Sequence, residues 1–296
     1  MNLPNIFDNS NNILFAGIGG GFDIFGAIPL WVELRKRNKN FVFSNYNGKA
    51  QKFNDEIYPE SYLKKILLEN KVDIPVYILP KTGVKAYIEI YKYIIDTHHC
   101  DTIVAIDGGI DSLMTGDEEN AGTILEDFVS LYALDSFDKI KYLVCTGFGT
   151  ELEEDISHYH ALENLSSLCK SGGFLGSASL IANTEEFDIY RHICEWVWQY
   201  GHKSHVHTKI ISAVLGEFGD KNLYDGVESN ILGASSVKNF SNPFMGIYWF
   251  FDLPKVLKTN KLYDSLAVTT TKTDVLMIFR QFLTETKLRK KQNLPW

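Results

Sequence analysis

The sequence predicts an α/β protein with a Rossmann-like, mostly parallel sheet, helices on both faces and a helix-rich C-terminal third. Short apolar runs alternate with amphipathic segments through the first two-thirds of the chain, an order typical of strands joined by crossover helices. Glycine-rich or acidic segments directly follow three of these runs. With 296 residues, 45% of them hydrophobic, the chain can form one large domain with a substantial core.

The apolar runs mark the expected strands, at residues 13–16, 41–43, 76–79, 103–106, 140–146 and 174–181. Helices are expected where apolar side chains recur at helical spacing, at about residues 24–37, 61–69, 84–97, 124–134, 157–170, 184–200 and 274–288, with a further one from 205. We expect one domain over residues 1–296. Its ligand-site core is expected at residues 13–181, and residues 182–296 form a helical, aromatic extension.

Charge and composition exclude several classes of protein. The net charge is −8 and no stretch before residues 287–291 is rich in Lys or Arg, so nucleic-acid binding has little support. The four cysteines form no CxxC pair, which favours free thiols in a reducing compartment. No stretch reaches the about 18 apolar residues of a membrane helix, and no signal peptide is recognised. We therefore expect a cytoplasmic protein without a membrane partner.

The first of the three segments is GIGGGFD at residues 17–23. A glycine loop between a strand and a helix points backbone N–H groups and a helix N-terminus at an anion. The dinucleotide fingerprint G-x-G-x-x-G fails because Phe22 replaces the third glycine, and the Walker pattern is absent. Glycines here can also serve helix–strand packing. Four of them favour contact with a ligand, and the expected contacts are Gly17, Gly19, Gly20, Gly21 and Asp23.

The second segment, residues 102–127, reads TIVAIDGGIDSLMTGDEENAGTILED and is dense with acids. Two carboxylates about 4 Å apart repel by roughly 4 kcal/mol at an effective dielectric near 20, and a cation, a shared proton or a cationic ligand would relieve this. Alternatively, the acids point into water and cap the following helix. The metal interpretation places a divalent cation on Asp107, Asp111, Asp117 and Glu118. Gly108 and Gly109 are expected ligand contacts.

The third segment, GFGTELEED at residues 147–155, follows the run at 140–146. Gly147, Gly149 and Thr150 are expected ligand contacts, and Glu151 is a candidate general base. His158 is a second candidate, because the positive end of a helix disfavours its protonation; an ordinary surface histidine is the alternative. If the strands are parallel, all three segments lie along the edge of the sheet where ligands bind.

These segments resemble a known family. GIGGGFDIFGAIP, DGGIDSLMTGDE, TGFGTELEED and SGGFLGSASL are similar to motifs of the uncharacterised "domain of unknown function 1152" family of archaea and bacteria. Its second motif, Gly-Gly-Asp, is interrupted here by Ile110, and its third ends Gly-Glu-Leu where this chain has Thr150 before Glu151. The resemblance covers most of residues 13–181. It implies one α/β unit and carries no activity.

The residues favour a small-molecule enzyme that hydrolyses or transfers a group of a phosphate-bearing or nucleotide-like ligand. Mg²⁺ or another divalent cation is the expected cofactor, and the candidate catalytic residues are Asp107, Asp111, Glu151 and His158. No G-x-S-x-G nucleophile motif occurs. The alternatives are a non-catalytic nucleotide-sensing regulator and an NAD-type ligand, since GIGGGFDIFGAIP is similar to the loop of sirtuin-like NAD-binding proteins with a spacing that differs by two residues.

The most aromatic stretch is FMGIYWFF at residues 244–251. It is expected to form core or a subunit interface, because a soluble domain seldom leaves such an apolar patch exposed. A homo-oligomer is therefore predicted, and a structural or interaction protein that uses this surface is a third possible function.

Overall fold

The computed structural model describes residues 1–46, 59–122, 124–151, 156–200, 203–221 and 239–294. Within these residues, seven strands form one sheet in the order β3-β2-β1-β4-β5-β9-β6. They are β1 (Asn12–Gly17), β2 (Asn40–Tyr46), β3 (Val76–Leu79), β4 (Thr102–Asp107), β5 (Ile140–Thr146), β6 (Phe174–Ser179) and β9 (Ile247–Asp252). Strands β1 to β5 pair in parallel, so the predicted α/β fold with a mostly parallel sheet is confirmed.

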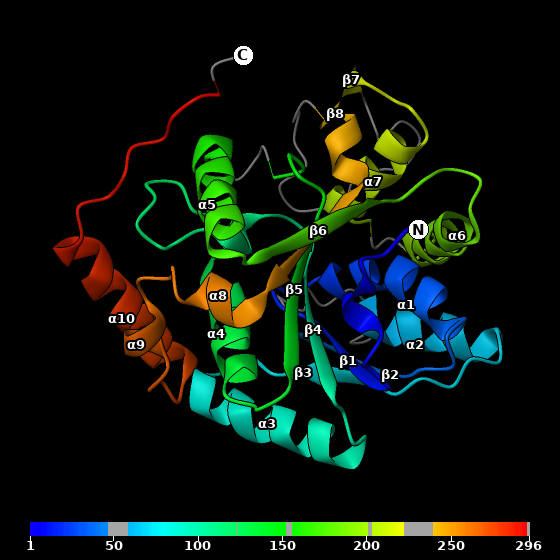
Figure 1. Cartoon of the computed structure of the whole chain (residues 1–296), viewed down its shortest axis with the longest axis horizontal. Coiled ribbons are helices and arrows are strands. Elements are labelled where there is room, and N and C mark those ends of the chain that lie inside the picture. Colours follow the sequence, from blue (N-terminus) through cyan, green and yellow to red (C-terminus); the bar gives the residue numbers. More distant parts are fainter. Residues whose placement is uncertain (47–58, 123, 152–155, 201–202, 222–238, 295–296) are drawn as a thin grey trace.

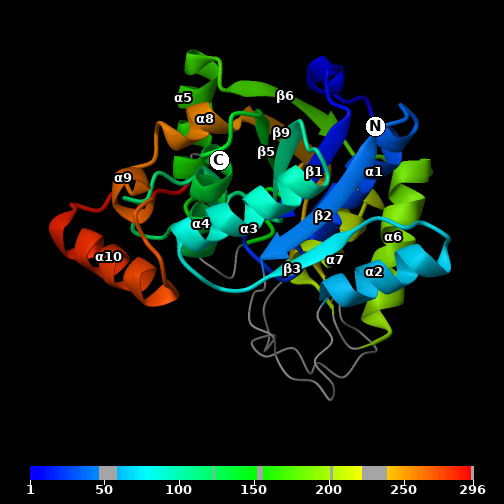
Figure 2. The ribbon, with the colours of Figure 1, turned by 90° about the horizontal axis from the view of Figure 1, so that it is seen from below.

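Helices cover both faces of the sheet (Figures 1 and 2). One face carries α1 (Ala27–Arg35), α2 (Pro59–Glu69), α6 (Glu185–Trp198) and α7 (His205–Val214). The other carries α3 (Val84–Thr97), α4 (Ile124–Asp135), α5 (His158–Ser171), α8 (Leu253–Leu257), α9 (Tyr263–Leu266) and α10 (Lys272–Glu285). A small pair, β7 (Gly219–Lys221) and β8 (Asn239–Ser241), lies outside the main sheet.

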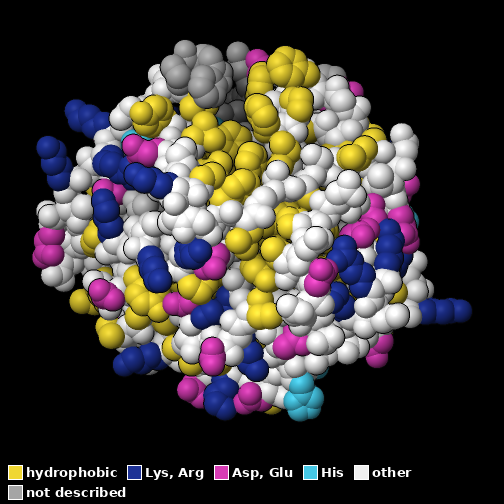
Figure 3. Space-filling view, viewed as in Figure 1, with side chains coloured by type: hydrophobic (Ala, Val, Ile, Leu, Met, Phe, Trp, Pro, Cys, Tyr) yellow, Lys and Arg dark blue, Asp and Glu magenta, His cyan; other side chains and the backbone are white. Residues whose placement is uncertain are grey.

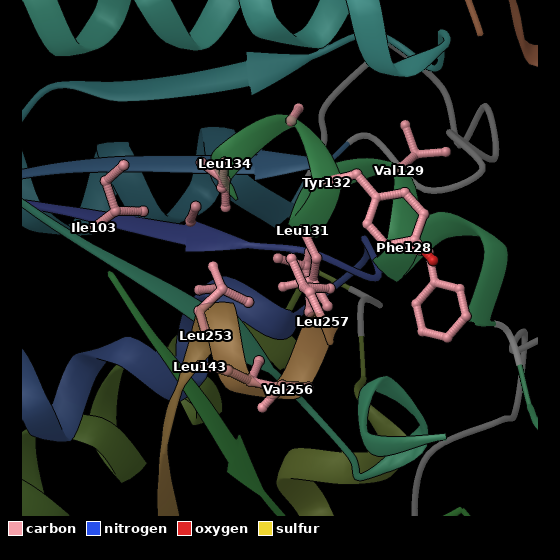
Figure 4. Close-up of a cluster of buried hydrophobic side chains, with 14 of the residues drawn as sticks. Ile103, Phe128, Val129, Leu131, Tyr132, Leu134, Leu143, Leu253, Val256 and Leu257 are labelled. Atoms are coloured by element: carbon pink, nitrogen blue, oxygen red, sulfur yellow. The ribbon is translucent and has the colours of Figure 1, made fainter. Parts of the chain in front are cut away.

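The alternation of side chains along each strand supplies both cores. In β1, Ile13 and Phe15 face the α1 side, whereas Leu14 and Ala16 face the α4 side. All four are fully buried, which explains why central strands covered on both faces appear in the sequence as unbroken apolar runs. Figure 4 shows the second core, where side chains of α4 and α8 pack against β4 and β5.

The aromatic stretch forms an inner strand that the sequence analysis did not identify. Strand β9 lies between β5 and β6 and is antiparallel to both. Tyr248, Phe250 and Phe251 are fully buried, and Phe244, before the strand, is exposed. The stretch is therefore core, and it no longer motivates a subunit interface. Figure 3 shows apolar side chains across the middle of the face that is seen in Figure 1. Such side chains can take part in association, so a homo-oligomer stays a prediction.

The strand order creates a switch point between β1 and β4. The chain leaves β1 towards β2 on one side, and β4 pairs with the other side of β1. Gly17 at the end of β1 lies in register with Ile106 near the end of β4. Ligands of open α/β sheets bind outside the carboxyl ends of the strands at such a point. The first two segments predicted from the sequence, after β1 and after β4, are therefore adjacent.

Candidate functional site

Three aspartates meet at the switch point. Asp23 begins the 3-10 helix η2 (Asp23–Gly26) after the glycine loop, Asp107 ends β4, and Asp127 lies in the first turn of α4. One carboxylate oxygen from each residue lies within 4.8 Å of the other two. Asp107 and Asp127 are buried and Asp23 is half-buried. The parallel pairing of β1 and β4 brings the first two together, and α4 contributes the third from the face above the sheet.

Asp127 has no hydrogen-bond donor for either carboxylate oxygen among the described residues, although its side chain is only 1% exposed. Its neighbours differ from it: Gly19 N donates to Asp23 Oδ2 over 2.5 Å, and the hydroxyl of Ser112 donates to Asp107. Buried polar groups are nearly always hydrogen-bonded, and an unpaired buried carboxylate is costly. Asp127 is therefore the group whose environment most requires a positive partner.

Two effects act on the pKa values of the three carboxyls. Burial, followed by the charges of neighbouring aspartates, raises the pKa of Asp23 and of Asp127 well above the ordinary value. Burial and the charge of Asp111 raise the pKa of Asp107 to about 8. Desolvation and like charges both favour the protonated acid, and a bound cation would reverse the second effect. The cluster thus has the properties of a cation site.

Asp111 and Glu151 extend this cluster. Asp111 begins the 3-10 helix η3 (Asp111–Leu113), is buried, and lies close enough to Asp107 and Asp127 for its charge to raise the pKa of both carboxyls. The Glu151 carboxylate lies over Gly109 and accepts the Ile110 N–H over 2.7 Å. The structure therefore brings together Asp107 and Asp111, as the metal interpretation expected, and adds Asp23 and Asp127 to them.

The glycines allow the carboxylates to approach the backbone. A Cβ at Gly19 would lie 2.5 Å from Asp127 Oδ1 and 2.8 Å from Asp23 Oδ2. At Gly108 it would lie 2.8 Å from Asp23 Oδ1, and at Gly109 2.2 Å from Glu151. All of these distances are too short for a real side chain. The first two glycine-rich segments thus surround the acids, while their contact with a ligand stays a prediction.

The glycine loop is fixed from two sides. Gly20 and Gly21 adopt φ values of 90° and 60°, which other residues rarely adopt. Asn45 at the end of β2 donates its Nδ2–H to the Gly21 carbonyl over 2.9 Å. On the other side, His207 of α7 places its Nε2 2.7 Å from the carbonyl oxygen of Phe22. Phe22 is the residue just before Asp23.

The tautomer of His207 follows from its partners. A carbonyl only accepts, so Nε2 carries the proton and Nδ1 accepts from the Tyr190 hydroxyl over 2.6 Å. Burial lowers the pKa of His207 to about 4, so the ring is neutral. The H-x-H pair His205 and His207 is only a weak metal-binding pattern, because such a pair faces one side only in a strand and here it begins a helix. In the structure, His207 positions the loop that carries Asp23.

The third segment lies at the end of β5. Gly147 and Gly149 adopt positive φ, and the buried Lys209 of α7 donates its ammonium to the Thr150 carbonyl over 2.6 Å. His158 lies beside Phe148 with ring centroids 5.3 Å apart, and burial lowers its pKa. A neutral His158 suits a general base, which stays a prediction. The acids at residues 153–155 of this segment lie outside the described residues.

Asp117 and Glu118 lie in a separate ion-pair network. Asp117 accepts from Lys261 and, over 3.1 Å, from Arg289 Nε. Glu118 accepts from Arg289 Nη2 over 2.5 Å and from the Thr115 N–H over 2.9 Å. The cations come from the C-terminal part of the chain, which the local sequence does not reveal. These two acids, predicted as metal ligands, are therefore already neutralised and do not join the aspartate cluster.

No helix in the described part of the chain is long and apolar enough to cross a membrane. A search of curated proteins found no match. The model of a family described as "Protein of unknown function (DUF1152)" matches residues 45–292. The match begins after the glycine loop and reaches into the C-terminal tail, so it covers more of the C-terminal third than the motifs indicated. The chain belongs to the DUF1152 family.

Proposed function

We propose that the protein is a divalent-metal-dependent enzyme that hydrolyses, or transfers a group of, a phosphate-bearing, nucleotide-like small molecule. The observation that carries this proposal is the Asp127 carboxylate, which is buried, lacks any donor among the described residues, and lies within 4.8 Å of Asp23 and Asp107. Hard divalent cations such as Mg²⁺ and Mn²⁺ prefer carboxylate and water oxygens. Asp23, Asp107 and Asp127 are the residues that would hold the cation.

The same charges favour a ligand that binds through the metal. A phosphate placed directly beside these aspartates would be repelled, so a cation must lie between the two. A metal ion in this position polarises a phosphoryl oxygen or lowers the pKa of a bound water. The positive-φ turn at Gly147 and Gly149 would supply backbone N–H groups to the ligand at the neighbouring strand end.

Glu151 and His158 remain the candidates for a general base. The metal-holding aspartates would have their oxygens occupied by the cation. Glu151, in the loop after β5, lies at the edge of the cluster against Gly109 and Ile110 of the loop after β4. His158 is kept neutral by burial, as a base near pH 7 requires. Either group would take a proton from a metal-bound water or from an acceptor hydroxyl.

The test is turnover of a panel of nucleotides and sugar phosphates by the purified protein, with Mn²⁺, with Mg²⁺ and with EDTA. We expect an ion-dependent product that disappears in Asp127→Asn. It should persist in Glu119→Gln, which changes an exposed acid of the same segment outside the cluster. Ion-dependent binding without turnover would instead show a non-catalytic regulator. Absence of any ion binding would contradict the metal site itself.

A further inference from the structure

The Asp127 carboxylate has acidic neighbours from several elements. One of its oxygens forms the set with Asp23 and Asp107, and Oδ1 faces the Cα of Gly19 in the glycine loop. Asp111, whose Oδ2 lies beside Gly122 in the segment that leads into α4, is near enough for its charge to act on the Asp127 carboxyl. Asp127 therefore has three acidic neighbours, Asp23, Asp107 and Asp111, and both of its oxygens lack a donor from the described residues.

One divalent cation does not balance this cluster. Asp23, Asp107, Asp111 and Asp127 carry four negative charges when ionised, and one divalent ion offsets two of them. Mg²⁺ is usually held by about one or two carboxylates with waters and ligand oxygens, so four exceed what one ion uses. A phosphate-bearing ligand adds further negative charge. The charge and the number of oxygens both fit more than one ion.

We infer that the cluster holds two divalent cations bridged by the Asp127 carboxylate. This inference rests on the proposed function and deepens it. The first ion would lie among Asp23, Asp107 and one oxygen of Asp127, and the second between the other Asp127 oxygen and Asp111. Ions in paired sites lie about 3.5–4 Å apart, a separation that a bridging carboxylate permits.

Two ions would suit in-line transfer of a phosphoryl group to water, which agrees with the phosphate-bearing ligand proposed above. One ion would hold the attacking water and the other would stabilise the leaving oxygen. The water oxygen forms a bond to phosphorus while the bond from phosphorus to the leaving oxygen breaks. The water would give one proton to Glu151 or His158, and the leaving oxygen would take a proton from that same group or from bulk water as the alcohol or phosphate departs.

The acids of the neighbouring network show what the cluster lacks. Glu118 is also buried, but Arg289, Thr115 and the Gly116 N–H donate to it. Its oxygens are thus saturated by protein donors, whereas those of Asp127 are not. The competing explanation is a single proton shared by Asp111 and Asp127, with one ion held by the other acids of the cluster.

The experiment is the Mn²⁺ stoichiometry of the full chain after removal of ions with EDTA, measured by equilibrium dialysis. Wild type should bind two ions per chain, Asp111→Asn one, and Asp111→Glu two. Asp127→Asn should lose the bridge and bind Mn²⁺ at least 100-fold more weakly. Glu119→Gln should bind two ions as wild type does. Circular dichroism shows whether each variant is folded.

Electron paramagnetic resonance of the Mn²⁺-loaded proteins adds a signature that stability cannot mimic. Two bridged ions should give an exchange-coupled spectrum in wild type and the spectrum of an isolated ion in Asp111→Asn. One ion per wild-type chain with an isolated-ion spectrum would overturn this inference, in favour of a shared proton, and leave the proposed function standing. No bound ion in wild type would contradict both. A second ion that survives Asp111→Asn would also overturn the inference.

Discussion

Replacing Asp127 by asparagine should stabilise the metal-free protein, although the residue is buried. At 4.8 Å and an effective dielectric near 20, two carboxylates repel by about 3.5 kcal/mol. Partial protonation already relieves part of this repulsion, because the pKa of Asp127 is raised by burial and by its acidic neighbours. We therefore expect a net gain of about 1–3 kcal/mol at pH 8, which corresponds to roughly 3–10 °C in melting temperature.

Asp117→Asn is the matched control, because the same chemical change should have the opposite effect. Burial acts to raise the pKa of Asp117, but the hydrogen bonds from Lys261 and Thr115 and the charge of Arg289 hold it below the ordinary value. Its carboxylate thus stabilises the fold. Removal of this charge leaves the cations of Lys261 and Arg289 without one of their partners and should lower the free energy of unfolding by about 1–3 kcal/mol. The loss is smaller than for a fully buried pair, because Lys261 is half exposed.

The assay is thermal melting of the three proteins at pH 8, first in EDTA and then with Mn²⁺. At an ion concentration about 100 times the dissociation constant, wild type and Asp117→Asn should gain about 2.7 kcal/mol for each bound ion, and Asp127→Asn should gain less than about 0.5 kcal/mol. The reasoning is refuted if Asp127→Asn melts below wild type in EDTA and responds to the ion as wild type does. Such a result would leave Asp127 as an ordinary stabilising carboxylate.

Three further outcomes follow. In EDTA, urea titrations should show that wild type loses stability as the pH rises from about 4 to 8. Over this range the folded protein retains a proton on Asp107 that the unfolded chain has released. Saturating Mn²⁺ should abolish this dependence of stability on pH. Gly19→Ala should abolish Mn²⁺ binding, because its Cβ would push the carboxylates apart. The Cβ of the control Gly21→Ala meets nothing within 4 Å, so this variant should lose only about 1–2 kcal/mol of stability to backbone strain and still bind the ion. Equal Mn²⁺ affinities of the two variants would exclude the steric argument. His207→Phe removes the donor to the glycine loop and should weaken Mn²⁺ binding about 10-fold, whereas His207→Gln should restore it. An unchanged Mn²⁺ affinity in His207→Phe would show that this hydrogen bond serves stability alone.

The order of strands and helices was predictable because each element has a local pattern. Buried parallel strands leave apolar runs, and their connecting helices leave apolar stripes. Strand β9 was not predictable in this way, because its partners β5 and β6 are far away in the sequence and its aromatic run fits core, interface or strand equally well. The ion pairs of Asp117 have the same property, since Lys261 and Arg289 reach it only through the tertiary fold.

The candidate site was predictable in part. Asp107 ends one strand and Asp23 follows the glycine loop after another, so a parallel sheet places both at the same edge. In the sequence, Asp127 does not stand out among the acids of its segment, because an acid in the first turn of a helix usually serves the helix dipole. A signal was present: Asp127, Leu131 and Leu134 share one helical face, so this acid belongs to the buried side of α4. His207 offered no such signal, since its partner Phe22 lies across the fold.

The most direct test of the metal centre is the anomalous scattering of Mn²⁺ in crystals of the protein grown or soaked with that ion. The account predicts anomalous peaks in contact with the carboxylates of Asp23, Asp107 and Asp127, and none at Asp117 and Glu118. A fully occupied peak at Asp117 or Glu118, or density in which the Asp127 oxygens contact only protein groups and water while Mn²⁺ is present at millimolar concentration, would contradict it.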